Sequence, residues 1–158
     1  MKYRTPFFAA LGLGLGIIST AIHASEFDQY LQQKQIINSK YKIKKKAELN
    51  ELLAVLSAED SKTLPLQIDQ NTVIEQLKLT ADKTELKGLI ITPDFAQFEQ
   101  DKGTKEVTSL IRKNLLNNCA IFYEHQYQLQ NPYKVSLELS STTQTYDVEI
   151  TQKDCKGK

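Results

Sequence analysis

Residues 133–151, YKVSLELSSTTQTYDVEIT, contain the clearest strand pattern in the chain. Apolar side chains occupy every second position on both sides of the polar turn 140–144. Successive side chains of a strand point to opposite faces of a sheet, so this alternation predicts a β-hairpin with one apolar and one solvated face. The apolar face needs a covering layer, which must come from the rest of the chain.

A second hairpin is predicted upstream, from two runs, 73–79 and 86–92, that are separated by the polar turn 81–85. Pro93 ends the second run. A polar, acidic connection containing Phe95 and Phe98 should follow. From Thr104, a candidate N-cap, to Cys119, apolar residues recur at spacings of three and four, which predicts a helix between the hairpins. Its apolar residues are Val107, Leu110, Ile111 and Leu115.

Helical spacing also marks the segment before Pro65. Phe27, Tyr30 and Leu31 begin a first helix, and a second helix has an apolar stripe. The members of that stripe are Leu49, Leu52, Leu53 and Leu56. Between the two helices, five lysines occur at positions 40, 42, 44, 45 and 46. We interpret them as a solvated boundary, with contact to anionic lipid or an acidic partner as the alternative.

The sequence therefore predicts an α+β fold: N-terminal helices, then hairpin, helix and hairpin, forming a small antiparallel sheet packed by a helix. We divide the chain into a leader 1–24, a helical segment 25–63 and an α+β domain 64–158, the last two forming one globular unit. Residues 120–130, AIFYEHQYQLQ, fit either the end of the helix or an irregular turn.

Residues 1–24 have the build of a secretory signal peptide: a charged start, an apolar run and then small residues. We expect cleavage after Ala24, with a cut after Ala21 or a permanent anchor as alternatives. This predicts a periplasmic protein, or else a secreted one, with no stable membrane insertion after cleavage. The full chain carries 20 Lys and Arg against 19 Asp and Glu, and removal of Lys2 and Arg4 leaves a slight acidic excess. Such a balance does not favour nucleic acid.

The two cysteines, Cys119 and Cys155, are predicted to form a disulfide in an oxidising compartment. The alternative is a redox-active pair, but neither cysteine belongs to a Cys-x-x-Cys unit. His125 is the only histidine after the leader, and no four-ligand spacing for zinc occurs. We expect no metal and no cofactor.

The order of these parts resembles a family of small, functionally uncharacterised exported proteins of Gram-negative bacteria with two cysteines. The resemblance covers residues 64–155. It rests on a Leu64-Pro65 segment, an Asp-x-x-Thr turn at 69–72, a helix ending in LLNNC and a last strand ending in ITQKDC. Leucines on the penultimate strand, where that family usually has tyrosines, are a departure from the pattern. The resemblance implies architecture and compartment, and no activity.

Nothing in the sequence defines a reaction. His125 is the only candidate for Ser-His-Asp chemistry, paired carboxylates remain an open possibility, and no phosphate loop or nucleophile elbow occurs. We therefore predict a non-catalytic module that binds another envelope or secreted protein, with a small periplasmic hydrolase or ligand-binding protein as the alternative. The candidate binding residues are aromatic, namely Phe122, Tyr123, Tyr127 and Tyr133, although these rings are also suited to covering the helix-to-strand junction.

Overall fold

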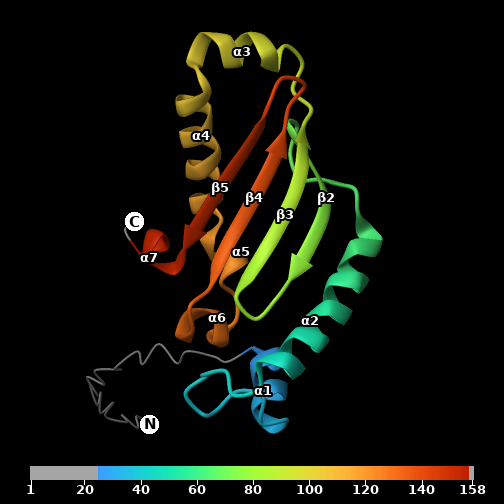
Figure 1. The fold of residues 1–158 in the computed structure, drawn as a ribbon, viewed down its shortest axis with the longest axis vertical. Coiled ribbons are helices and arrows are strands. Elements are labelled where there is room, and N and C mark those ends of the chain that lie inside the picture. Colours follow the sequence, from blue (N-terminus) through green and yellow to red (C-terminus); the bar gives the residue numbers. More distant parts are fainter. Residues whose placement is uncertain (1–24, 157–158) are drawn as a thin grey trace, which may run out of the picture.

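The chain folds around a five-stranded sheet with the strand order β1-β2-β3-β4-β5 (Figure 1). The structure is a computed structural model that describes residues 25–156, so the predicted leader 1–24 lies outside the described residues. The strands are β1 (Leu66–Gln67), β2 (Thr72–Leu79), β3 (Lys83–Ile90), β4 (Lys134–Ser140) and β5 (Thr145–Thr151). The predicted α+β fold with two hairpins is confirmed.

All neighbouring strands are antiparallel except the central pair, β3 and β4, which is parallel. A parallel pair requires a long crossover, and four helices supply it here. They are α3 (Phe95–Lys102), α4 (Thr104–Asn117), α5 (Cys119–Phe122) and α6 (Gln126–Gln130). The two predicted hairpins are therefore joined into one sheet through this crossover.

The crossover differs from the sequence prediction in three places. The connection expected around Phe95 and Phe98 is helix α3, and α4 starts directly after it. Gly103, at a positive φ of 78°, makes the bend between the two helices, and no side chain caps α4. The predicted helix 104–119 ends at Asn117, and the undecided segment 120–130 contains the end of α5 and all of α6.

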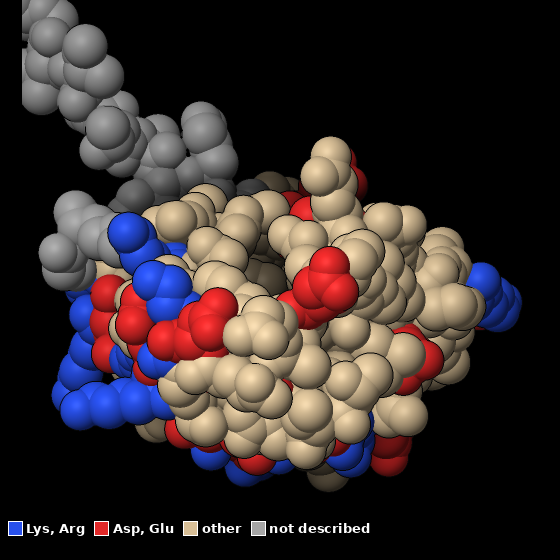
Figure 2. All heavy atoms as spheres, turned by 90° about the horizontal axis from the view of Figure 1, so that it is seen from above, with Lys and Arg blue, Asp and Glu red and all other residues tan. Residues whose placement is uncertain are grey.

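The hairpin β4–β5 has the predicted two-faced character. Its inward side chains are buried, and they are Val135, Leu137, Leu139, Tyr146, Val148 and Ile150. The opposite face carries cross-strand ion pairs, Lys87–Glu138 (N···O 3.1 Å) and Lys134–Glu149 (2.6 Å). Seen from the α3 end, charged side chains of both signs are interspersed at the margins of the molecule (Figure 2). No broad basic surface appears in this view.

Two helices flank the sheet: α2 (Lys46–Asp60) packs beside β2, and α4 packs beside β5 (Figure 1). Polar side chains of α2 also satisfy the backbone of the β2–β3 hairpin. The Ser57 hydroxyl accepts a hydrogen bond from the N–H of Leu79, and Asn50 accepts one from that of Ala81, both at 2.8 Å. Helix α1 (Glu26–Gln33) lies at the end of the molecule that also contains α6.

Two short helical segments complete the chain, the 3-10 turn η1 (Ser61–Thr63) after α2 and α7 (Gln152–Cys155) after β5. Between residues 25 and 156, no helix is both long enough and apolar enough to cross a membrane.

Candidate binding groove

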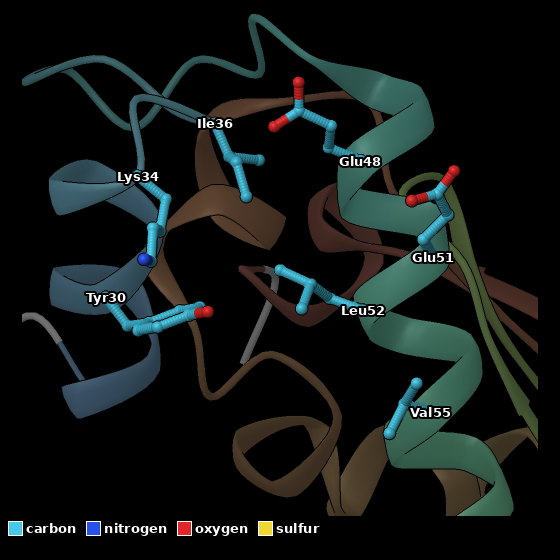
Figure 3. Close-up of a pocket in the computed structure, with 7 residues that line it drawn as sticks. All are labelled: Tyr30, Lys34, Ile36, Glu48, Glu51, Leu52 and Val55. Carbon is cyan, nitrogen blue, oxygen red and sulfur yellow. The ribbon is translucent and has the colours of Figure 1, made fainter.

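A groove of about 330 Å³ lies between α1 and α2 (Figure 3). Its walls are Tyr30 from α1, Lys34 and Ile36 after that helix, and Glu48, Glu51, Leu52 and Val55 from α2. Two of the apolar members are accessible, since 61% of Val55 and 41% of Tyr30 are exposed, whereas Ile36 is buried at 3%. We call these seven residues the α1–α2 groove.

The groove exists because α2 carries more apolar side chains than the sheet can cover. Leu49 and Leu53 are spaced four residues apart and are buried in the core. Leu52 is only half-buried, and Leu56 is 37% exposed. Of the single apolar stripe that the sequence predicted for α2, Leu49 and Leu53 are thus buried, Leu52 lines the groove, and Leu56 is exposed outside it.

Charges occupy the rims of the groove. Glu48 pairs with Lys45 (N···O 3.1 Å), and the Lys34 ammonium lies 5.7 Å from the centre of the Tyr30 ring. Glu51 is exposed and, within the part of the chain that the structure describes, takes no ion-pair partner. An apolar groove with an available carboxylate at its rim suits a segment that combines apolar side chains with a basic one.

The α1 wall of the groove is fixed by Asp28, which is fully buried. Its two carboxylate oxygens accept hydrogen bonds from the backbone N–H groups of Gln126 (2.8 Å) and Tyr127 (3.2 Å) at the start of α6. Ser25, the N-cap of α1, donates its hydroxyl hydrogen to the same carboxylate at 2.8 Å. One carboxylate therefore joins the N-terminal ends of two helices, where negative charge is favourable.

The three residue types of a hydrolase triad meet here, in Ser25, Asp28 and His125. The serine hydroxyl, however, lies between the carboxylate and the imidazole. Nδ1 of His125 lies 2.8 Å from Oγ of Ser25. Because the single hydroxyl hydrogen of Ser25 goes to Asp28, we assign Nδ1 as the donor in this contact. Triad chemistry needs the histidine between serine and carboxylate and able to accept the serine proton. This arrangement instead serves to hold α1 in place.

The aromatic residues predicted as a binding surface lie in the segment that runs from α5 through α6 to the start of β4. Tyr123, Tyr127 and Tyr133 are buried, at 7%, 1% and 6% exposure, and Phe122 is half-buried. The rings meet edge to face, with centroids 6.0 Å apart for both the 123–133 and the 127–133 pairs. Burial raises the pKa of Tyr123 to about 12, and burial also raises the pKa of Tyr127. Binding through these rings stays a prediction.

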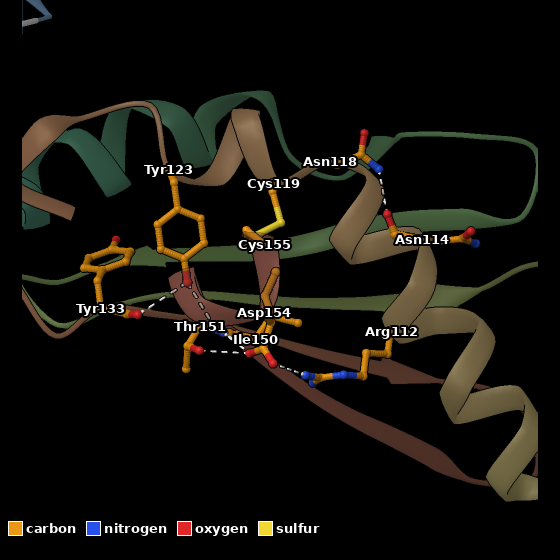
Figure 4. Close-up of a disulfide and its surroundings, with 10 residues drawn as sticks. All are labelled: Arg112, Asn114, Asn118, Cys119, Tyr123, Tyr133, Ile150, Thr151, Asp154 and Cys155. Carbon is orange, nitrogen blue, oxygen red and sulfur yellow. Dashed lines mark hydrogen bonds and ion pairs between the residues drawn. A yellow bond between two sulfur atoms is a disulfide. The ribbon is translucent and has the colours of Figure 1, made fainter. Parts of the chain in front are cut away.

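The disulfide predicted between Cys119 and Cys155 is confirmed, and it ties α5 to α7 (Figure 4). Arg112 of α4 reinforces this corner by pairing with Asp154 (N···O 2.8 Å). Hydrogen bonds from the backbone and hydroxyl of Thr151 hold the pKa of Asp154 below its usual value. Nowhere in residues 25–156 do three or more His, Cys, Asp or Glu side chains gather in a way that could hold a metal ion.

The sequence analysis placed Tyr30 and Leu52 on the apolar sides of two helices but did not identify them as groove residues, and it did not name Val55. The available signal was the run LLAVL at 52–56, which supplies more apolar side chains than one helix face can hold. That surplus did not reveal whether α1 would cover those side chains or leave them accessible.

No family model and no curated protein matches this sequence. Among solved structures, the chain is similar to a Pseudomonas aeruginosa protein described as secreted, with 14% identity and a TM-score of 0.48 over 70% of this chain and 95% of that one. It is also similar to two type II secretion pilotins. EpsS of Vibrio vulnificus has 13% identity and a TM-score of 0.47 over 72% and 96% of the two chains, and AspS of Vibrio cholerae has 18% and 0.47 over 70% and 94%. Identities this low establish no family, and the predicted membership stays a prediction.

Proposed function

We propose that the mature chain is an exported, non-catalytic module that binds another protein of the cell envelope through the α1–α2 groove. The observation that carries the proposal is the pair of accessible apolar side chains on the two walls of the groove, Val55 of α2 at 61% exposure and Tyr30 of α1 at 41%. Exposed apolar side chains that gather in a groove with a polar rim are typical of interaction sites.

A protein segment fits this groove better than a small ligand does. Small-molecule sites enclose most of their ligand and add a few convergent polar groups that fix its orientation. Here the polar groups, Lys34, Glu48 and Glu51, stand at the rims, and the apolar side chains of Tyr30 and Val55 are exposed. We expect the partner to insert apolar side chains between Tyr30 and Val55 and to place a basic residue near Glu51.

The location of this function rests on two features. The leader-like residues 1–24 indicate export, and the Cys119–Cys155 disulfide suits an oxidising compartment such as the periplasm. The alternative, a small hydrolase, gains no support from the Ser25–His125 contact, because the serine proton is directed to Asp28.

The test is site-specific photocrosslinking from position 55 in living cells, with the crosslinked protein identified by mass spectrometry. We expect one predominant partner, and we expect its capture to be lost in the Leu52→Glu variant. The control is Leu89→Glu, since Leu89 is also an accessible leucine, at 39%, but lies on the solvated face of the sheet. Equal capture by both glutamate variants, or no predominant partner, would refute the groove as the binding site.

A further inference from the structure

The loop between α1 and α2 is basic, and it lies at the end of the molecule that contains α1 and α6 (Figure 1). Residues 34–47 contain six lysines and no acidic residue. Within this stretch, residues 37–43 close a small loop through the bridge between Ile37 and Ile43, and Ile37 is buried. Lys40, Lys42 and Lys44 are exposed. We call residues 38–46 the basic loop.

Side-chain hydrogen bonds hold the basic loop in one conformation. Oδ1 of Asn38 accepts from the N–H groups of Lys40 and Lys42, both at 2.9 Å. Asn131, after α6, accepts from the N–H of Ile43 at 3.1 Å and donates to the carbonyl of Tyr41 at 2.8 Å. Because the backbone is already ordered, presenting these lysines to a surface requires little further loss of conformational entropy.

The lysines of the loop differ in how far their charge is neutralised. Lys45 and Lys46 form ion pairs with Glu48 (N···O 3.1 Å) and Asp82 (2.6 Å). Lys42 donates to the carbonyl of Gln130, which leaves its charge uncompensated. For the side chains of Lys40 and Lys44, residues 25–156 provide no acidic partner. The loop therefore carries a net positive charge on a protein that is close to neutral overall.

The basic loop lies near the point where the described chain begins. Asp28, three residues after Ser25, binds the start of α6, whereas Asn131, which clamps the loop, directly follows the end of α6. The two attachments thus lie at opposite ends of the same five-residue helix. An apolar leader that engages a membrane would bring this end of the domain to the lipid surface before cleavage.

We propose that the basic loop docks on a bilayer surface containing anionic phospholipid, independently of the partner in the α1–α2 groove. The contact is peripheral: lysine ammonium groups lie at the headgroups, and no part of the domain enters the hydrocarbon. The leader-like residues 1–24 directly precede this end of the domain in the sequence, and they favour a lipid surface over an acidic protein. Attraction of this kind is additive over the lysines that reach the surface and is weakened by salt.

The test measures binding of the purified mature chain, with its disulfide intact, to two kinds of vesicle. One contains phosphatidylcholine alone and the other adds phosphatidylglycerol. We expect binding to the second kind only, and we expect it to weaken as salt is raised. Each lysine at an anionic surface strengthens binding by about five-fold, so the double variant Lys40→Gln/Lys44→Gln should bind about thirty-fold more weakly.

The matched control removes the same charge from α4, in the double variant Lys105→Gln/Lys113→Gln, because both lysines are exposed there. This control should keep the binding of the parent chain. Equal loss in the two double variants would show that only net charge matters, and it would overturn the proposal. The absence of binding to phosphatidylglycerol vesicles would do so too. Competition by inorganic phosphate at matched ionic strength would instead assign the loop to free anions, and that outcome also overturns docking on a bilayer.

Discussion

Removing the carboxylate of Asp28 should detach α1 from the domain. Asp28 is fully buried and accepts hydrogen bonds from the backbone N–H groups of Gln126 at 2.8 Å and Tyr127 at 3.2 Å. In Asp28→Ala both N–H groups lose their acceptor, so they are left unsatisfied for as long as α1 stays docked over them. The hydroxyl of Ser25 loses its acceptor as well.

The magnitude follows from these lost contacts. A buried donor without a partner costs about 1 to 3 kcal/mol, and loss of a helix cap costs about 1 kcal/mol, partly the same effect. We therefore expect the free energy of unfolding to fall by about 2 to 5 kcal/mol in Asp28→Ala. Asp28→Asn keeps one acceptor oxygen, so its loss should be smaller.

The assay is urea unfolding of the mature chain followed by far-UV circular dichroism, together with limited proteolysis of α1. Glu26→Ala is the matched control, because Glu26 stands in the same first turn but is exposed. It removes only a surface charge near the helix N-terminus and should change stability by less than about 1 kcal/mol. If the two alanine variants lose the same stability and resist protease equally, the description of Asp28 as the attachment of α1 is wrong.

Three further outcomes follow from the rest of the structure. Replacing both cysteines with alanine should lower the free energy of unfolding by about 4 kcal/mol, since the disulfide closes a loop with a sequence separation of 36, and denaturant titration measures this. The hydroxyls of Thr143 and Tyr146 donate to Glu99 and hold its pKa below the usual value. This contribution to stability is therefore present above about pH 4 and is lost as pH falls through the lowered pKa. In Glu99→Gln, the stability measured by acid titration should depend less on pH than it does in the parent chain. Gly88→Ala should destabilise the sheet by more than about 2 kcal/mol, because an added Cβ would lie 2.2 Å from a carbonyl oxygen of β2, and thermal unfolding would reveal the loss.

The hairpins were predictable because their information is local. In residues 133–151 the period of two assigns each side chain to a face, and burial of one face then follows. The parallel pairing of β3 with β4 was not predictable in the same way, because the alternation of side chains in one strand does not determine which strand pairs with it. That pairing depends on the crossover, and the crossover depends on how α4 packs against β5.

The candidate site was harder to predict from the sequence than the fold was. The tyrosines at 123, 127 and 133 were predicted as candidate binding residues, and all three are buried. Val55 was not predicted as a binding residue, although 61% of it is exposed. Aromatic residues serve cores and interfaces equally well, so their type alone does not separate the two uses. The separation comes from which helix surface lacks a covering element, and this is a property of the tertiary arrangement.

The attachment of α1 and the proposed binding function are physically linked. Tyr30 and Lys34 form one wall of the groove, and Asp28, in the same short helix as Tyr30, holds that helix against α6. A partner that contacts both walls binds only the molecules in which α1 is docked. It must therefore stabilise the docked state by mass action. Asp28→Ala should accordingly weaken partner capture even though Asp28 does not line the groove, and a saturating partner should restore part of the lost protection of α1 against protease.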